Sequence, residues 1–344
     1  MNLFPSIITF AASLLAGIMG TELFRRNSLR RNWLDHPNER SSHVLPTPRG
    51  AGLVIVSISL TAYSAIGLFF SSTFSWGYLV GALLVAGISW LDDLYSLPFF
   101  VRLVAHFAAA LLIMLDAGYW SSVGFSNEQA MGLDGFGSVI TAVWIVWVIN
   151  AYNFMDGIDG IAGVQAVVAA AAWAIISMSA PGTSAYAFVL AGSSLGFLIH
   201  NWHPARVFMG DVGSAFLGYT FAAFGLLYTH GTGASSPGVP IISILILWPF
   251  LLDTILTMAR RAWNREKFWQ AHRKHLYQRL VIAGFSHSFV TMAYGVFAIM
   301  SSAAALVIYL TSGKGGVLQI AILITTSIIF AVVVRRKTSL RSAS

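Results

Sequence analysis

The sequence predicts an all-α protein, a polytopic transmembrane helical bundle with about eleven spans, or ten if one apolar run does not cross. The chain of 344 residues is 57% hydrophobic and only 10% charged, with a mean hydropathy of +0.74. This composition exceeds what the core of a globular protein needs. Apolar runs of roughly 20 residues, long enough to cross a bilayer, recur along the chain. They are too long and too continuously apolar for barrel strands, so we expect helices.

Each expected span is one continuous apolar run. The first run resembles a signal peptide only superficially, because it has no basic residue before its apolar core and no clear small-residue cleavage site. Ten more runs follow it, so we expect it to be a helix. The runs lie at residues 3–23, 50–70, 77–91, 99–118, 137–154, 161–180, 184–200, 211–230, 239–259, 286–311 and 315–334.

The distribution of positive charge predicts the orientation, with the N-terminus outside and the C-terminus in the cytoplasm. In this orientation the inside segments contain eighteen of the twenty Lys and Arg residues, Arg102 begins the fourth span on the inside, and Lys314 alone lies outside. This is a strong positive-inside bias. The net charge of +7 is therefore explained by topology, and no nucleic-acid partner is expected. The inside segments are 24–49, 92–98, 155–160, 201–210, 260–285 and the tail from residue 335.

The chain is predicted to form one integral-membrane domain, residues 1–344, because no soluble domain, linker or low-complexity tract interrupts the spans. No internal repeat is evident, which disfavours a transporter built from inverted halves. The absence of cysteine excludes disulfides and thiolate metal sites. The polar motifs that follow all lie on the inside face.

The most informative motif is NAYNFMDGIDGIAG, residues 150–163, at the end of a strongly apolar run. One charge at a bilayer centre costs at least roughly 2.5–3.5 kcal/mol, so such groups usually face a cavity, a partner or a substrate. Asn153, Asp156 and Asp159 are spaced three apart, which keeps them on one face of any helical part. A polar turn between two spans is the alternative, but a turn needs neither two carboxylates nor the adjoining Asn150.

Adjacent carboxylates end the third span in the motif WLDD, residues 90–93, and Arg102 follows at the entry to the fourth span. Neighbouring like charges suit metal binding or proton abstraction, which are roles for Asp92 and Asp93. A solvated helix end would account for a lone pair of aspartates equally well, so both interpretations stay open for this motif taken alone.

The motif FMGDVGSAFLG, residues 208–218, supplies Asp211 at the start of the eighth span. A carboxylate at a helix amino terminus is favoured by the dipole, so helix capping alone could account for Asp211. Capping would not account for the polar residues just before the motif, which are His200, Asn201, His203 and Arg206.

The basic motif HRKHLYQRL, residues 272–280, lies in the longest inside loop. Taken alone, it is typical of a juxtamembrane stretch that binds anionic lipid headgroups. Five carboxylates on the same face change that interpretation. Carboxylates bind Mg²⁺, whereas Arg, Lys and His bind phosphate oxygens, and phosphoryl transfer requires both kinds of group.

These four motifs, in this order and on one membrane face, resemble the polyprenyl-phosphate N-acetylhexosamine-1-phosphate transferases. That family includes the enzymes that initiate O-antigen, enterobacterial common antigen and teichoic acid linkage synthesis, and the muramoyl-pentapeptide phosphotransferase. The resemblance covers nearly the whole chain. It begins at DHPNERSSHVLPTPRGAG, residues 35–52, which is similar to the family's first cytoplasmic loop bordering the nucleotide site.

The resemblance implies a Mg²⁺-dependent reaction, with Mn²⁺ as a substitute, at the cytoplasmic face of the bacterial inner membrane. Undecaprenyl phosphate attacks the β-phosphorus of a UDP-amino sugar, which gives a lipid diphosphate sugar and UMP. Direct attack is expected, and a phosphorylated Asp211 intermediate is the alternative. Further partners are membrane lipids, and a second copy of the chain is compatible with the family.

The resemblance also implies roles for individual residues. Asp211 matches the family's metal-binding aspartate, and Asn153 matches an asparagine close to the same Mg²⁺. Asp92 and Asp93 match the paired aspartates at the phosphate centre, where Asp92 is expected to deprotonate the lipid phosphate. The residues expected to bind substrate are Asn150, Asn153, Asp156, Asp159, Phe208, Arg102, His272, Arg273 and His275, with Phe208 stacking on uracil.

The basic loop departs from the family's peptidoglycan enzyme, which has consecutive histidines where this chain has HRKH. The departure argues against a muramoyl-pentapeptide substrate. It favours the branch that initiates lipopolysaccharide O-antigen or related cell-wall glycans, whose sugars include GlcNAc and deoxy-amino sugars such as FucNAc or QuiNAc.

Two other classes of membrane protein use intramembrane carboxylates, namely intramembrane aspartyl proteases and proton-coupled transporters. A protease would not need five carboxylates and a basic loop on one face, and a transporter's carboxylates should lie near the midplane. Asp253 has two equal interpretations, structural pairing and support of the active site. His106, His230 and His287 have no matching partner, so we interpret them as satisfied or interfacial histidines.

Overall fold

The computed structural model describes residues 4–35, 45–234, 236–266 and 273–341. Within these ranges, ten helices are long and apolar enough to cross a membrane, and there are eleven spans if one bent pair of helices counts as a further span. The prediction of a polytopic all-α bundle is therefore confirmed. Strand is confined to two pairs of two-residue segments in the described chain.

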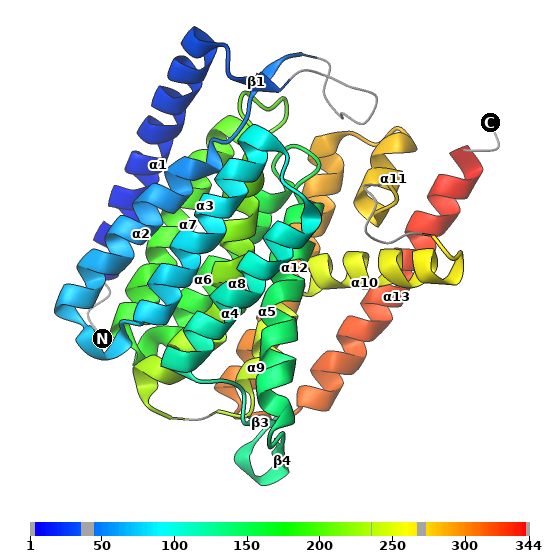
Figure 1. The fold of residues 1–344 in the computed structure, drawn as a ribbon. Coiled ribbons are helices and arrows are strands. Elements are labelled where there is room, and N and C mark those ends of the chain that lie inside the picture. The colour runs from blue at the N-terminus through cyan, green and yellow to red at the C-terminus, as the bar shows by residue number, and fades with distance from the viewer. Residues whose placement is uncertain (1–3, 36–44, 235, 267–272, 342–344) are drawn as a thin grey trace.

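The order of elements follows the predicted runs closely (Figure 1). Two antiparallel pairs, β1 with β2 and β3 with β4, join Leu34–Asp35 to Thr47–Pro48 and Ser122–Val123 to Met131–Gly132. Short 3₁₀ turns lie at Ser71–Thr73, Asn127–Gln129 and Ser177–Ser179. The helices are α1 Phe4–Arg31, α2 Gly52–Phe69, α3 Trp76–Tyr95, α4 Phe99–Ala117, α5 Phe136–Met155, α6 Ile161–Ile176, α7 Pro181–Asn201, α8 Asp211–Thr232, α9 Val239–Ile246, α10 Trp248–Trp263, α11 Leu276–Ile282, α12 His287–Leu310 and α13 Gly316–Arg341.

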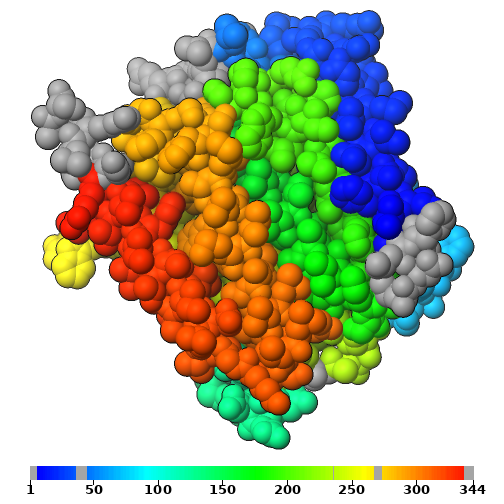
Figure 2. Space-filling view, turned by 180° about the vertical axis from the view of Figure 1, so that it is seen from behind, coloured from blue at the N-terminus to red at the C-terminus, as the bar shows by residue number. Residues whose placement is uncertain are grey.

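Helix α8 is the centre of the bundle. It packs against α2, α3, α4, α5, α6, α7 and α9, and 94% of its most apolar stretch is buried. By contrast, only 17% of the corresponding stretches of α1 and α13 is buried. Figure 2 shows these two helices, blue and red, at opposite margins of one face. The start of α8, which carries Asp211, is therefore held by neighbours on several sides.

The prediction that residues 239–259 form one continuous helix is wrong. The structure divides it into α9 and α10, which are bent by 78° at Leu247. Pro249 explains the break, because it has no N–H to donate to the preceding turn. Gln165 Nε2 donates to the Ile246 carbonyl at the break, over 2.9 Å. Helix α10 consequently lies crosswise to the long helices in Figure 1 and extends out from the bundle past α13.

Two expected inside loops are partly helical. Helix α1 continues beyond the predicted end of the first span to Arg31, and the predicted loop 260–285 contains the end of α10 and all of α11. The basic residues that predicted these loops therefore lie partly on helix ends. Cations near the last turn of a helix are favoured by its dipole, as Arg30 and Arg31 are in α1.

Close helix packing near Asp211 depends on glycine. A Cβ added to Gly52, the first residue of α2, would lie 2.4 Å from the Gly213 Cα in α8. No side chain fits at that distance, so α2 and α8 would have to separate. Gly87, in the middle of α3, has nothing within 4 Å of such a Cβ.

We predict opposite effects of alanine at these two positions. Gly52→Ala should lower the midpoint of thermal unfolding in detergent, with a cost of about 1–3 kcal/mol from overpacking. Gly87→Ala should raise it slightly, because alanine is favoured over glycine in a helix by about 0.5–1 kcal/mol. Equal midpoints for the two variants would contradict the close contact between α2 and α8.

Candidate active site

The ends of α3 and α5 meet the start of α8, and this meeting point brings the predicted acidic residues together. Asp211 is the first residue of α8, and its Oδ2 accepts a hydrogen bond of 3.1 Å from Nδ2 of Asn153, in the last turn of α5. Ser214 Oγ donates to the Asn153 Oδ1 over 3.2 Å and so holds the amide from its other side. Asp92 and Asp93, in the last turn of α3, complete the acidic cluster.

Two arginines bridge the carboxylates of the acidic cluster. Arg49 Nη2 lies 2.7 Å from Asp211 Oδ1 and 3.0 Å from Asp93 Oδ1. Arg102 Nη1 lies 2.5 Å from Asp92 Oδ2 and 3.5 Å from Asp211 Oδ2. Because each cation serves two carboxylates, the like charges can be held close together. The Arg49 side chain is 43% exposed and that of Arg102 is 28% exposed, so anions can approach both.

Asp93 caps the central helix. Its Oδ1 accepts a hydrogen bond of 3.1 Å from the Asp211 N–H, and its Oδ2 accepts one of 3.0 Å from the Val212 N–H. A carboxylate in this position satisfies two N–H groups that have no partner within the helix, and the helix dipole favours it. The Asp93 side chain is 6% exposed and that of Asp211 is 19% exposed. Asp93 therefore positions α8, and Asp211 is the more accessible carboxylate.

The loop before α2 is joined to the loop before α8. Three backbone hydrogen bonds of 2.8–3.0 Å connect residues 48–52 with residues 208–209, and the Phe208 side chain is half-buried beside them. This pairing brings Arg49 to Asp211 across 162 residues of sequence. Sequence analysis did not identify Arg49 as a site residue. The available signal was its place in PTPRGAG, within the segment that resembles the family's nucleotide loop.

Gly210 is the residue that lets the two loops and α3 come together. It has a φ of +75°, and a Cβ there would lie 2.8 Å from Asp93 Oδ2 and 2.9 Å from the Gly50 Cα. Glycine is therefore required at this position for two independent reasons, backbone conformation and space.

Asp156 directly follows α5 and is half-buried. Burial, followed by the negative charge of Asp211, raises the pKa of Asp156 to about 7. The turn that carries it is held by Tyr277, whose hydroxyl donates to the Phe154 carbonyl over 3.0 Å. Asp156 can therefore change its charge near neutral pH.

Asp253 has a structural role, since its carboxylate is paired with groups around the start of α11. This was one of the two interpretations that the sequence left open. Its Oδ1 lies 3.0 Å from His275 Nδ1 and accepts a hydrogen bond of 2.9 Å from the Leu276 N–H. Its Oδ2 accepts bonds of 3.1 Å from the Tyr277 N–H and 2.6 Å from the Tyr294 hydroxyl. Asp253 thereby anchors the start of α11. His275 is buried in this contact, with 3% exposure, and its substrate role stays a prediction.

The remaining predicted residues lie apart from the acidic cluster or outside the described residues. Asn150 Nδ2 donates to the Val146 carbonyl over 2.7 Å and lies 3.4 Å from His106 Nδ1. His272 lies outside the described residues. Arg273 lines a cavity of about 180 Å³ near the end of α10 and the start of α11. The other basic residues that line this cavity are Arg260, Arg261, Lys274 and Arg279.

Asp159 lies among histidines. His203 Nδ1 lies 2.6 Å and His287 Nδ1 lies 3.3 Å from Asp159 Oδ2. Our interpretation of His287 as a histidine without a matching partner was therefore incomplete. The sequence did not predict this contact, because the three residues are far apart in the chain. They come from the turn before α6, the loop after α7 and the start of α12.

The acidic cluster fits the expected Mg²⁺. Asp92 and Asp211 offer carboxylate oxygens, which are the ligand chemistry that Mg²⁺ prefers. The Asn153 amide would have to turn its Oδ1 from Ser214 toward Asp211 to add a further oxygen. Arg49 and Arg102 hold positive charge against the same carboxylates. Mg²⁺ binding would require at least one of these arginines to release Asp211.

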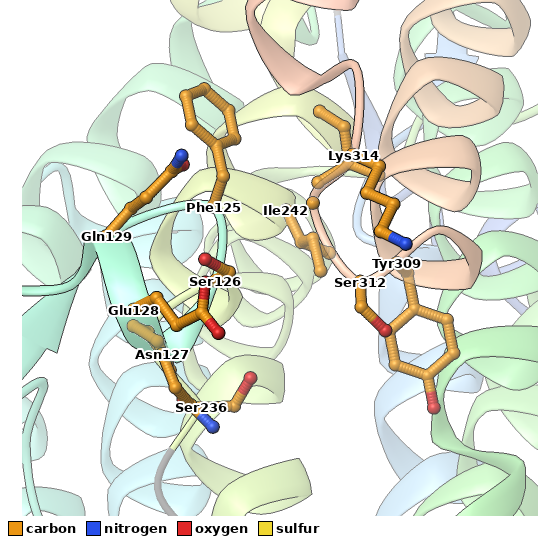
Figure 3. A pocket seen from close by; sticks show the side chains of 14 residues that line it. Phe125, Ser126, Asn127, Glu128, Gln129, Ser236, Ile242, Tyr309, Ser312 and Lys314 are labelled. Carbon is orange, nitrogen blue, oxygen red and sulfur yellow. The ribbon is translucent and has the colours of Figure 1, made fainter.

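A cavity of about 580 Å³ lies away from the acidic cluster, at the opposite end of the bundle. Figure 3 shows Glu128 on one wall and Lys314 on the other, with Tyr309 beside Lys314. Glu128 comes from the α4–α5 loop, Lys314 from the α12–α13 turn, and Tyr309 from the last turn of α12. None of the predicted catalytic residues lines this cavity.

Comparisons with known proteins agree with the motifs. Residues 75–229 match the family described as Glycosyl transferase family 4. The chain is 29% identical to a probable undecaprenyl-phosphate N-acetylglucosaminyl 1-phosphate transferase of Bacillus subtilis (strain 168), over 88% of this chain and 84% of that protein. It is 28% identical to a decaprenyl-phosphate N-acetylglucosaminephosphotransferase of Mycobacterium leprae, over 95% of this chain and 87% of that protein.

A third similarity is confined to a short segment. The chain is 54% identical to a phospho-N-acetylmuramoyl-pentapeptide-transferase of Nostoc punctiforme over 54 residues, which are 16% of this chain and 15% of that protein. The first two of these relatives, which match most of the chain, are both named as N-acetylglucosamine phosphotransferases that use a polyprenyl phosphate, undecaprenyl or decaprenyl phosphate.

The raised pKa of Asp156 predicts a pH-dependent stability. The folded protein binds this proton more tightly than the unfolded chain, whose aspartates have a pKa of about 3.9. Stability should therefore fall as pH rises from about 4 to about 7. Asp156→Asn removes the ionisation, so its midpoint of thermal unfolding should exceed that of the parent at about pH 8 and approach it at about pH 5. A difference that does not change with pH would contradict the buried charge.

Proposed function

We propose that the chain, whose residues 75–229 match the family described as Glycosyl transferase family 4, transfers an N-acetylhexosamine-1-phosphate from a UDP-sugar to undecaprenyl phosphate. The products are UMP and an undecaprenyl diphosphate sugar, the first lipid-linked intermediate of an O-antigen-like glycan. The observation that carries the proposal is the acidic cluster of Asp92, Asp93 and Asp211 with bridging Arg49 and Arg102. In this cluster, carboxylates, which can bind Mg²⁺, are in direct contact with arginines, which can bind phosphate.

The reaction must bring two anions together, a lipid phosphate and a nucleotide diphosphate. Their repulsion has to be offset by positive charge, so positioning and electrostatic stabilisation should supply most of the catalysis. Arg49 and Arg102 are half-exposed cations in contact with Asp211. We assign both arginines to binding phosphate oxygens of the two substrates. These oxygens would replace part of the contact that the arginines now make with the carboxylates.

The proposed chemical step is a direct displacement. An oxygen of the lipid phosphate forms a bond to the β-phosphorus, the bond from that phosphorus to the bridging oxygen breaks, and UMP leaves with the bridging oxygen. Asp92 would accept any proton that the lipid phosphate carries. Its Oδ2 is held by Arg102 and its Oδ1 by the Leu97 N–H, over 2.6 Å, so the carboxylate is fixed in orientation.

Mg²⁺ is part of this proposal, with Mn²⁺ as a substitute. Asp211 and Asn153 would hold it, and when bound it would neutralise charge on the diphosphate oxygens. Asp93 keeps Asp211 in place by capping α8. Asp156 and Phe208 are assigned to the nucleotide side, because both lie on turns that adjoin this cluster.

The location of the cluster suits a lipid acceptor. Its residues lie at the ends of membrane-length helices, where a phosphate can stay at the surface while the polyprenyl tail remains in the bilayer. The positive-inside bias supports a cytoplasmic location for this surface, and the resemblance to the family is our reason for proposing the inner membrane of a bacterium. We also propose that the chain can form a homodimer.

The names of the two long relatives favour GlcNAc as the first sugar to test. A deoxy-amino sugar such as FucNAc or QuiNAc is the second choice. This chain has HRKH where the peptidoglycan enzyme has consecutive histidines, and the difference favours the branch of the family that uses such sugars. The experiment incubates purified protein with Mg²⁺, undecaprenyl phosphate and a panel of UDP-amino sugars, and measures UMP release. Release with one donor, dependent on the lipid phosphate, supports the proposal, and no release with any donor would overturn it.

Substitution of Asp211 tests the assigned metal ligand. Asp211→Asn keeps the shape of the side chain but removes its charge, so UMP release should fall at least about 100-fold, the range seen when one preorganised electrostatic group is lost. The matched control is Asp134→Asn, an exposed aspartate next to the start of α5 at the other end of the bundle. Near-normal turnover by Asp211→Asn, in protein that unfolds at the parent temperature, would disprove the assignment.

A further inference from the structure

The cavity of about 580 Å³ at the end of the bundle opposite the acidic cluster has no part in the proposed transfer reaction. Three segments form its walls, namely the α4–α5 loop, the α8–α9 loop and the α12–α13 turn with the end of α12. Its volume lies within the range of about 300–1,000 Å³ that is typical of ligand sites. It is called the Glu128–Lys314 cavity below, after the two charged residues on its opposite walls (Figure 3).

The walls of the Glu128–Lys314 cavity are fitted to one another. The Gly124 N–H donates a hydrogen bond of 2.9 Å to the Pro237 carbonyl, which joins the α4–α5 loop to the α8–α9 loop. Phe125 lies so close to the α12–α13 turn that a Cβ added to Gly313 or Gly316 would overlap it. Gly313 also has a φ of +87°, a conformation that favours glycine. The three segments therefore form one continuous rim around the cavity.

Lys314 is the exception in the distribution of charge along the chain. Of the twenty Lys and Arg residues, it is the one that the sequence predicts to lie outside, and the outer segments of membrane proteins are usually poor in such residues. Lys314 forms no ion pair with any residue that the structure describes. A lone cation on the wall of a cavity, without an acidic partner, points to an anionic group on a ligand.

Glu128 supplies the opposite charge. It also forms no ion pair within the described part of the chain. A purely anionic ligand would be repelled by Glu128, and a purely cationic one by Lys314, so the cavity selects a ligand that carries both charges. Uncharged polar residues of the lining can donate or accept further hydrogen bonds, and they are Ser126, Asn127, Gln129, Ser236 and Ser312.

The surroundings of the cavity favour a lipid as the ligand that carries these charges. The cavity lies where α12 ends and α13 begins, and both helices are long and apolar enough to cross a membrane. Large apolar side chains next to the lining residues are exposed. Leu310 and Val317 are each 72% exposed, and Leu318 is 61% exposed. Exposed apolar surface at this position suits contact with acyl chains, so a lipid can place its headgroup in the cavity while its chains stay in the bilayer.

We propose that the Glu128–Lys314 cavity binds the headgroup of a zwitterionic phospholipid of the phosphatidylethanolamine class. Lys314 pairs with the lipid phosphate and Glu128 with the lipid ammonium, and both contacts are charge-assisted hydrogen bonds. The bound lipid joins the α4–α5 loop to the α12–α13 turn. Because the cavity and Asp211 lie at opposite ends of the bundle, the inference does not depend on the proposed transferase activity.

The test measures lipid binding by native mass spectrometry. Full-length protein, delipidated in detergent, is mixed with equal amounts of phosphatidylethanolamine and phosphatidylglycerol, and the bound lipids are counted. Phosphatidylglycerol carries the phosphate but not the ammonium, so it tests the role of Glu128. The variants are Lys314→Gln, Glu128→Gln and Glu128→Lys. The matched control is Asp134→Asn, an exposed aspartate of the same α4–α5 loop that does not line the cavity.

We expect the parent to retain one phosphatidylethanolamine per chain and to prefer it about tenfold over phosphatidylglycerol, which is the effect of one hydrogen bond to a charged group. Lys314→Gln should bind both lipids about tenfold more weakly. Glu128→Gln should abolish the preference, and Glu128→Lys should reverse it. The control should behave as the parent. Without added lipid all variants should unfold at the parent temperature, because both charged side chains are exposed.

Three results would overturn the proposal. Equal retention of the two lipids by the parent would show that the cavity does not select a zwitterion. Equal retention of phosphatidylethanolamine by the parent and Lys314→Gln would show that the lipid binds elsewhere. Phosphoethanolamine, the headgroup without acyl chains, is the competitor that tests the lipid itself. If it binds as tightly as the lipid does, the ligand is a soluble zwitterion and not a phospholipid.

Discussion

The capping of α8 by Asp93 is the interaction on which the rest of the site depends. Both carboxylate oxygens of Asp93 bind N–H groups at the start of α8, and Arg49 binds the same carboxylate. The helix is buried through the centre of the bundle, so fixing its first residue fixes Asp211 relative to α3. The capped helix end thus gives the Asp211 carboxylate a defined position beside α3.

Charge balance explains why several carboxylates can share this small volume. Unpaired, they would repel one another, and burial would favour their neutral forms. Arg49 and Arg102 bridge them instead, at distances of 2.5–3.5 Å. The bridges are partly exposed, which makes them exchangeable for phosphate contacts. A site that holds cations and carboxylates in mutual contact contains the two kinds of group that the proposed reaction needs, one for an anionic substrate and one for a divalent ion.

The helices and most of the acidic cluster were predictable, because apolar runs of bilayer length and polar motifs at helix ends are local patterns. Asp92 and Asp211 could be placed together from those motifs. The bend at Leu247 was missed because Pro249 was interpreted within a continuous run, although proline ends helices. Arg49 and the contact of His287 with Asp159 were missed for another reason. Both depend on long-range packing, across 162 residues in the case of Arg49.

The central claim is that Asp211, held by the Asp93 cap, binds Mg²⁺ while the arginines turn to the diphosphate. An electron cryomicroscopy structure with Mg²⁺ and UDP-GlcNAc tests it most directly. The account predicts a metal beside the Asp211 carboxylate, diphosphate oxygens in contact with Arg49 or Arg102, and Asp93 still bonded to the start of α8. A nucleotide bound elsewhere, with Asp211 paired to both arginines as in the structure described, would contradict it.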